Sequence, residues 1–170
     1  MPAKLGRLRL TLNGSYMLKD TTTPLSGEHT YDCVGLFGST CQTVNPRWRH
    51  IFSATWQTPA NVDVGMNWRF IGKVGYDGND PDPTLHATGQ ATFGAYNDFD
   101  RTLPNVSYID LFAEWNTPFR GLTVRGGINN LLDKDPPLAT FEITSGGAAN
   151  TYSTYDSLGR QIYLAFTAKF

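Results

Sequence analysis

Apolar and polar residues alternate strictly at the end of the chain. From Ile162 to Phe170 every even position is apolar, and the odd positions from Gln161 to Lys169 hold the more polar set. A period of two residues is typical of a β-strand that has one apolar face and one wetter face. The pattern therefore predicts a strand that runs into the final residue.

Five earlier segments have the same period. They lie at residues 7–18, 47–56, 62–70, 108–115 and 122–129. Ordinary strands have about five to six residues, whereas a tilted strand that crosses a bilayer needs about nine to eleven. The length of these segments favours membrane-spanning strands.

The connections between the predicted strands alternate in length. Short turns lie at 57–61 and 116–120, and long connections rich in Gly, Pro, Asn, Asp, Ser and Thr lie at 19–46, 76–104 and 133–157. Three such loops are unusual in a compact soluble domain, but outer-membrane barrels combine short periplasmic turns with long external loops. We therefore predict an all-β fold: an antiparallel transmembrane β-barrel segment of six long strands. Aromatic residues near strand ends are expected to form interfacial girdles: Tyr16, Trp48, Trp56, Trp115 and Phe170.

Composition agrees with this fold and excludes some partners. Of 170 residues only 17% are charged and 13% are aromatic, and the net charge of −1 does not suggest a nucleic-acid partner. The mean hydropathy of −0.32 and the lack of a long apolar run exclude a transmembrane helix. They do not exclude a barrel, because residues that face the lumen dilute its hydropathy. The first residues lack the apolar core of a signal peptide, so we expect a mature chain or a piece of a longer precursor.

Two cysteines, Cys33 and Cys41, lie close together in the first long connection. A single closely spaced pair is typical of a disulfide in an oxidising compartment. The alternative is two free thiols in a cytosolic protein.

Several segments resemble the TonB-dependent outer-membrane receptors. The segment from Gly126 to Pro137 reads G-G-I-N-N-L-L-D-K-D-P-P and resembles the signature of their penultimate strand. The segment from Thr154 to Phe170 resembles their last strand. Upstream, similar segments are Y-D-C-V-G-L-F-G-S-T-C, N-P-R-W-R-H, S-A-T-W, M-N-W-R-F-I-G and D-L-F-A-E-W.

The resemblance implies that the chain, residues 1–170, is the C-terminal part of a barrel of about 22 strands. The signal peptide, TonB box and plug domain of the family are not found in it, so we expect a fragment or one part of an assembly. The family's function is TonB-energised uptake of a scarce nutrient such as an iron chelate, cobalamin or a glycan. The implied location is the outer membrane of a Gram-negative bacterium. The implied partners are outer-membrane lipid, the rest of the barrel and plug, the TonB system and the barrel-assembly machinery.

The resemblance also suggests roles for individual residues. The last strand should carry the barrel-assembly signal, with Phe170, Phe166 and Leu164 on its apolar face. Exposed aromatic residues of the long connections are candidate substrate contacts, with packing within the loops as the alternative: Tyr31, Phe37, Tyr96, Phe99 and Tyr152.

No catalytic or metal-binding motif stands out, so we expect neither an enzyme nor a cofactor. The three histidines lack ligand spacing. Asp110 and Glu114 share one strand face, and we interpret them as part of a hydrated lumen balanced by Arg69 or Arg125. The D-x-x-D-x-D run from Asp77 to Asp82 lacks the spacing of an EF-hand. The alternative function class is a soluble β-sandwich that serves as a binding or adhesion module, with its apolar faces packed sheet on sheet.

Overall fold

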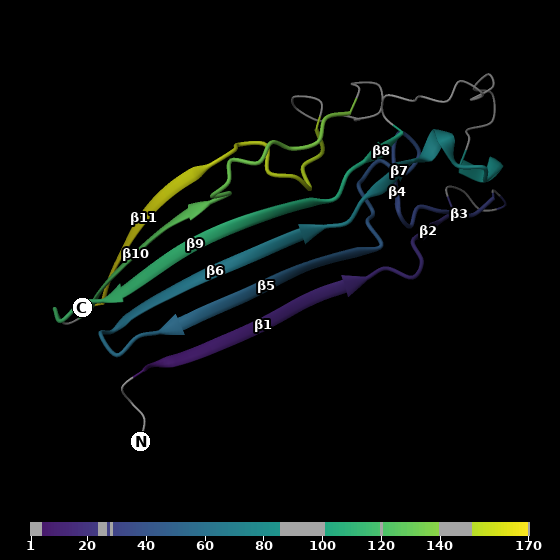
Figure 1. Ribbon diagram of the computed structural model, residues 1–170. Helices are drawn as coiled ribbons and strands as arrows, with labels where there is room; N and C mark the ends of the chain where they lie inside the picture. Colours follow the sequence, from purple (N-terminus) through teal and green to yellow (C-terminus); the bar gives the residue numbers. More distant parts are fainter. Residues whose placement is uncertain are drawn as a thin grey trace.

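Six long strands form one antiparallel sheet in the order of the sequence (Figure 1). The computed structural model describes residues 5–23, 27, 29–85, 101–119, 121–139 and 151–169. The long strands are β1 (Arg7–Tyr16), β5 (Trp48–Gln57), β6 (Val62–Ile71), β9 (Val106–Asn116), β10 (Leu122–Asn129) and β11 (Gln161–Ala168). Each strand pairs with the one before it, so β1 and β11 are the two edges of an open sheet. The six predicted strands are confirmed, with ends that shift by a few residues.

The long connections contain short elements that the sequence pattern did not predict. The strands β2 (Thr21–Thr22) and β3 (Tyr31–Asp32) pair with each other, and β4 (Leu36–Phe37), β7 (Val74–Tyr76) and β8 (Thr102–Leu103) form a second small sheet. The 3₁₀ helices η1 (Asp77–Asn79) and η2 (Pro83–Leu85) follow β7. Strands of two or three residues are too short to show a period, so only pairing in space reveals them.

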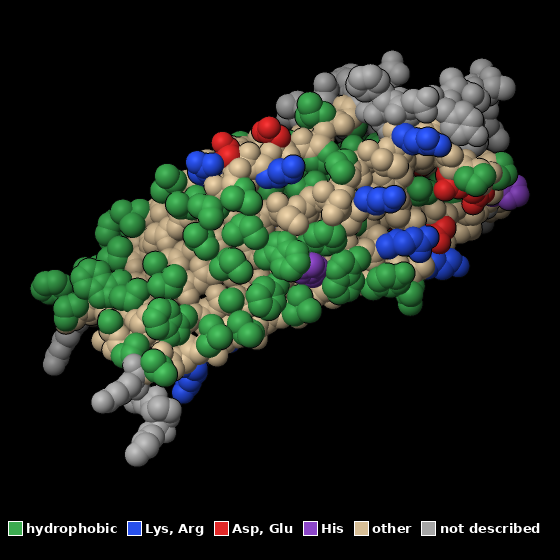
Figure 2. Space-filling model, viewed as in Figure 1, with side chains coloured by type: hydrophobic (Ala, Val, Ile, Leu, Met, Phe, Trp, Pro, Cys, Tyr) green, Lys and Arg blue, Asp and Glu red, His purple; other side chains and the backbone are tan. Residues whose placement is uncertain are grey.

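The register gathers the apolar positions of all six strands on one face of the sheet. Met66 lies opposite Ala54 on one side and opposite Leu111 on the other. The apolar side chains of β10 are partly buried on this face. The other five long strands contribute exposed apolar side chains, including Leu8, Leu10, Leu12, Trp56, Val64, Trp68, Trp115, Ile162, Leu164 and Phe166. Figure 2 shows hydrophobic side chains spread broadly over one face of the molecule. Because strand side chains alternate, Asn67 and Arg69 lie on the other face, as the pattern predicts.

The two ends of the sheet differ. The short turns, the start of β1 and the end of β11 lie at one end of the sheet, and the long connections gather at the other, which we call the outer end (Figure 1). In the short turns Asn61 (φ 57°) and Gly121 (φ 77°) adopt the left-handed conformation that these reversals need. The outer end also contains the buried core, because the side chains of lowest exposure come from the long connections and from the strand ends beneath them.

The described residues do not form a sandwich. Their apolar face has no second sheet packed against it, and its large side chains stay exposed. No helix in the described part is long and apolar enough to cross a membrane.

Candidate functional site

The three long connections fold over the polar face of the sheet at its outer end. Phe37 from the first connection, Val74 and Leu103 from the second, and Tyr152 and Tyr155 from the third form one buried cluster. Val106 and Tyr108 of β9 supply its floor. Since these two residues alternate with the exposed apolar positions of β9, the cluster lies on the face that also holds Arg69. The connections are therefore anchored inside the curve of the sheet rather than on its apolar face.

An ion-pair network joins the last connection to two strands of the sheet. The guanidinium of Arg69 on β6 donates two hydrogen bonds to the Asp110 carboxylate on β9, at 2.7 and 2.9 Å. Its Nη2 also donates to Asp156, which lies just before β11, at 3.3 Å. The amide of Asp156 donates to the Tyr108 hydroxyl at 3.2 Å. Paired, charge-assisted hydrogen bonds of this kind are strong and directional.

The N-N-L-L-D motif forms the corner after β10. Asn130 is fully buried with a φ of 50°, and its side-chain amide exchanges two hydrogen bonds with the backbone of Lys134. Its own amide nitrogen donates to Asp110 at 2.9 Å. Asp133 accepts a hydrogen bond from the Arg160 amide at 2.8 Å, which ties this corner to the start of β11. Asn and Asp suit such corners because they tolerate positive φ and their short side chains reach the backbone.

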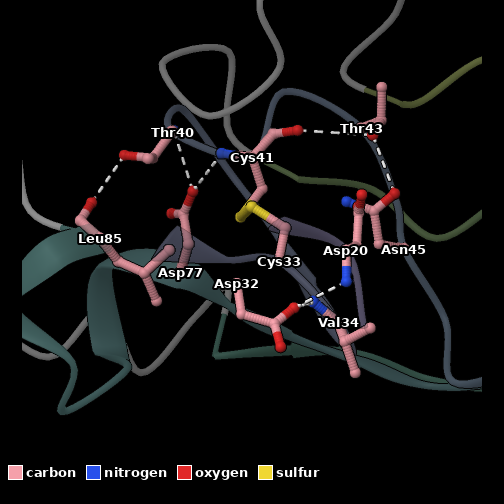
Figure 3. Close-up of a disulfide and its surroundings, with 10 residues drawn as sticks. All are labelled: Asp20, Asp32, Cys33, Val34, Thr40, Cys41, Thr43, Asn45, Asp77 and Leu85. Atoms are coloured by element: carbon pink, nitrogen blue, oxygen red, sulfur yellow. Dashed lines mark hydrogen bonds between the residues drawn. A yellow bond between two sulfur atoms is a disulfide. The ribbon is translucent and has the colours of Figure 1, made fainter. Parts of the chain in front are cut away.

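A disulfide joins Cys33 to Cys41 in the first connection (Figure 3). The carboxylate of Asp77 accepts hydrogen bonds from the amides of Thr40 and Cys41, each at 2.9 Å. The Thr40 hydroxyl donates to the carbonyl of Leu85 at 2.8 Å. The disulfide loop is thus bound to the second connection through both η1 and η2. Asp80 and Asp82 accept hydrogen bonds from nearby backbone amides, and no group of metal-ligand residues occurs in the described chain.

Two clefts open at the outer end. One, of about 450 Å³, lies on the polar face beside Arg49, Ile51, Arg69, Ile71 and Thr154. The Arg49 Nε donates to the Ser15 hydroxyl at 3.2 Å. The other cleft, of about 310 Å³, lies beside the disulfide and is lined by polar residues that include Asp20, Thr22 and Gln42. Both clefts are large enough for part of a small polar or anionic ligand.

Tyr155 has an unusual place in the buried cluster. Its hydroxyl is buried without a hydrogen-bond partner in the described structure. Burial away from water raises the pKa of this hydroxyl, and nearby Tyr108 and Tyr152 raise it further. The phenol therefore stays neutral over the whole physiological pH range.

The structure places the candidate substrate contacts unevenly. The rings of Phe37 and Tyr152 are buried, with exposures of 0% and 7%, and their centroids are 5.9 Å apart. The expectation that these two rings are exposed is therefore wrong, because the connections pack against one another. Tyr31 is partly buried beside the disulfide. Tyr96, Phe99 and Phe170 lie outside the described residues, while Leu164 and Phe166 are exposed on the apolar face of β11.

Comparison with solved structures identifies the fold. No protein-family model and no curated protein sequence matches the chain. Its fold matches a variant of the ferric enterobactin receptor PfeA from Pseudomonas aeruginosa in complex with enterobactin, with a TM-score of 0.57 and 19% identity. That match covers 100% of this chain and 21% of the receptor chain. This chain has the fold of part of a TonB-dependent receptor barrel.

Two further structures of that receptor agree. PfeA in complex with BCV-L6 has a TM-score of 0.57 and 18% identity, over 96% of this chain and 20% of its own. A double variant of PfeA has a TM-score of 0.54 and 21% identity, over 97% and 20%. The chain therefore spans about a fifth of the receptor's length. The resemblance of the sequence segments to TonB-dependent receptors is confirmed at the level of the fold.

Sequence reasoning missed several members of the outer-end site. It predicted that an arginine would balance Asp110, and Arg69 does so, but it did not predict the contact of Arg69 with Asp156. Tyr155 and Asn130 were also missed. The sequence did contain a signal for the corner after β10. Asn130 and Asp133 lie in a motif that follows a strand, and the side chains of such residues often form hydrogen bonds with the backbone at turns.

Proposed function

We propose that this chain is the C-terminal part of the β-barrel of an outer-membrane receptor and contributes about six of its 22 strands. The whole receptor would take up an iron chelate of the siderophore class with energy from the TonB system. The observation that carries the proposal is the open sheet with one continuous apolar face and a fold that matches about a fifth of a ferric enterobactin receptor.

The free edges of the sheet support a larger assembly. In the described chain β1 pairs only with β5, and β11 only with β10. Lipid provides no hydrogen-bond partners for unpaired backbone groups, and exposed sheet edges promote association with other strands. Further strands must therefore cover both edges within a membrane. The plug domain would then lie against the polar face.

The spacing of the aromatic residues supports a membrane location. Trp48 and Trp56 lie on the apolar face, eight residues apart on β5, which corresponds to about 26 Å along a strand. A strand tilted by about 40° covers about 20 Å of membrane thickness over that length. This is close to the apolar band of about 25 Å found in outer-membrane barrels.

The choice of an iron chelate depends on the solved structures with this fold, which are ferric enterobactin receptors. The outer end would contact the ligand from the cleft beside Arg49 and from Tyr31, Tyr96 and Phe99. Arg49 at this cleft suits an anionic chelate, because a guanidinium binds carboxylates and similar oxyanions well, whereas Arg69 is already paired with Asp110 and Asp156. The last strand, with Leu164, Phe166 and Phe170, would be recognised by the barrel-assembly machinery.

Expression of the chain tests the assembly proposal. Residues 1–170 alone should not form a heat-modifiable, protease-resistant barrel, because both edges lack partners. The genomic DNA upstream of Met1 should encode a plug domain in frame. A stable monomeric barrel formed by this chain alone would contradict the fragment proposal.

Growth on a sole iron source tests the uptake proposal. Disruption of the intact gene should abolish growth on a specific iron chelate, and the restored gene should recover it. Deletion of Phe170 in that gene should reduce the amount of assembled receptor more than the affinity of the assembled molecules for the chelate. Unchanged growth on every iron chelate tested would refute the iron assignment and leave the barrel proposal standing.

A further inference from the structure

The polar cleft beside the disulfide has two walls that the disulfide holds together. One wall is the β2–β3 pair with the residue before it, which contributes Asp20, Thr22 and Tyr31. The other wall is the segment 40–43. The disulfide joins the residue directly after β3 to the second residue of that segment (Figure 3). A cleft whose walls are linked covalently keeps its shape before a ligand arrives, which lowers the entropy lost on binding.

Hydrogen bonds to the backbone fix both walls. The Cys33 amide donates to the Asp20 carbonyl at 2.9 Å, and the Asp20 amide donates to the Asp32 carboxylate at 2.9 Å. On the other wall the main-chain amide of Gln42 donates to the carbonyl of Gly38 at 2.8 Å. The side chains of Asp20 and Gln42 therefore belong to backbone that is held in place on each side of the cleft.

Several polar side chains at the cleft have no hydrogen-bond partner among the described residues. They are the carboxylate of Asp20, the hydroxyls of Thr22 and Tyr31, and the side-chain amide of Gln42. Together these groups supply both donors and acceptors in one concave place. A few polar groups that converge on a cleft are the feature by which binding sites fix the orientation of a ligand.

The chemistry of the lining excludes several classes of ligand. None of the described residues that line the cleft is basic, and Asp20 carries a negative charge, so an anion is disfavoured. Asp20 is the one carboxylate in the described lining, whereas calcium takes about six to eight oxygen ligands. A neutral ligand rich in hydroxyl groups fits, because a hydroxyl both donates and accepts and can pair with a carboxylate and with either end of an amide.

We propose that this cleft binds a sugar ring of a neutral saccharide. The Asp20 carboxylate accepts hydrogen bonds from hydroxyls of the sugar, the Gln42 amide and the Thr22 hydroxyl bind further hydroxyls, and the apolar face of the sugar packs against the Tyr31 ring. The site goes beyond the proposed uptake of an iron chelate, which concerns the cleft beside Arg49. It requires only that the outer end of the sheet faces the external medium.

The test uses the intact barrel that contains this chain, in micelles of a neutral detergent without a sugar headgroup. The methyl glycosides of glucose, galactose and mannose are titrated in, and binding is followed by saturation-transfer difference NMR. At least one glycoside should bind. Asp20→Asn should weaken its binding at least fivefold and Thr22→Val at least threefold, because both changes keep the shape of the side chain and remove a hydrogen-bonding group or its charge. The matched control Asp135→Asn, at an exposed carboxylate of the third connection, should leave the affinity unchanged.

A second measurement on the unmodified barrel tests whether Asp20 instead creates a cation site. Ethanolamine, a cation at neutral pH, should not displace the glycoside, and 1 M salt should leave glycoside binding unchanged, because screening within about 3 Å weakens the binding of charged ligands only. The absence of binding by all three glycosides, equal effects of Asp20→Asn and Asp135→Asn, or displacement by ethanolamine would overturn the site. These outcomes do not affect the iron assignment, which growth on an iron chelate tests separately. A chain that never enters a barrel would overturn the proposed function, and the saccharide site with it.

Discussion

Replacing Arg69 by Met should release the last long connection from the sheet. The variant keeps most of the side-chain volume but removes the bidentate contact with Asp110 and the contact with Asp156. Asp110 would retain only the amide of Asn130 as a donor in the described structure. The carboxylates would then be left without a positive partner, at side-chain exposures of 11% and 15%.

The expected loss lies between two limits. Breaking a buried pair costs about 3–5 kcal/mol, and an exposed pair contributes about 0–1 kcal/mol. The Arg69 side chain is 33% exposed, so water screens part of the interaction. We expect Arg69→Met to lower the free energy of unfolding by about 2–3 kcal/mol.

Urea unfolding of the intact barrel in micelles measures this loss, and limited proteolysis between β10 and β11 reports on the connection. Arg49→Met is the matched control, because Arg49 lies on the same face but makes a single hydrogen bond to a hydroxyl. It should cost less than about 1 kcal/mol. The double variant Arg69→Met, Asp110→Asn should recover part of the loss, since Asp110 is then neutral and only Asp156 keeps an unpaired charge. Equal effects of the two single variants would refute the assignment of Arg69 as the anchor.

Three other predictions address the faces, the disulfide and the buried phenol. Met66→Arg should lower the free energy of unfolding of the intact barrel by about 2–4 kcal/mol and Asn67→Arg by much less; the reverse order would mean that the faces are exchanged. Thiol labelling of unreduced, denatured protein should find no free cysteine, and Cys33→Ser with Cys41→Ser should destabilise the first connection by about 2–3 kcal/mol, measured by proteolysis with and without the pair. For Tyr155, the raised pKa means that the folded state holds the phenolic proton more tightly than the unfolded state does, so the contribution of this group to the free energy of unfolding should be constant below about pH 10 and fall above it. Tyr155→Phe should remove this alkaline loss without destabilising the protein at pH 7; an unchanged alkaline transition would assign the loss to another group.

The sequence alone determined the strands, their apolar face and the ends of the sheet. A period of two residues is a local property, so each of the six segments displays it without reference to its partner. The lengths of the connections likewise distinguish the two ends of the sheet, because the short turns lie at one end and the long connections at the other. In the sequence Asn130 is recognisable only as part of a motif that follows a strand. Its structural role depends on the hydrogen bond that its amide nitrogen donates to Asp110, which the motif does not predict.

Only the tertiary structure decided how the outer end is built. Arg69 and Asp156 are 87 residues apart in the chain, and nothing in the spacing of either residue indicates the other. Phe37 and Tyr152 were expected at the surface, but they are buried because connections from different strand pairs return over the same floor. Contacts between distant segments depend on which strands pair and on where that pairing places the connections between them. A local pattern of residues does not contain this information.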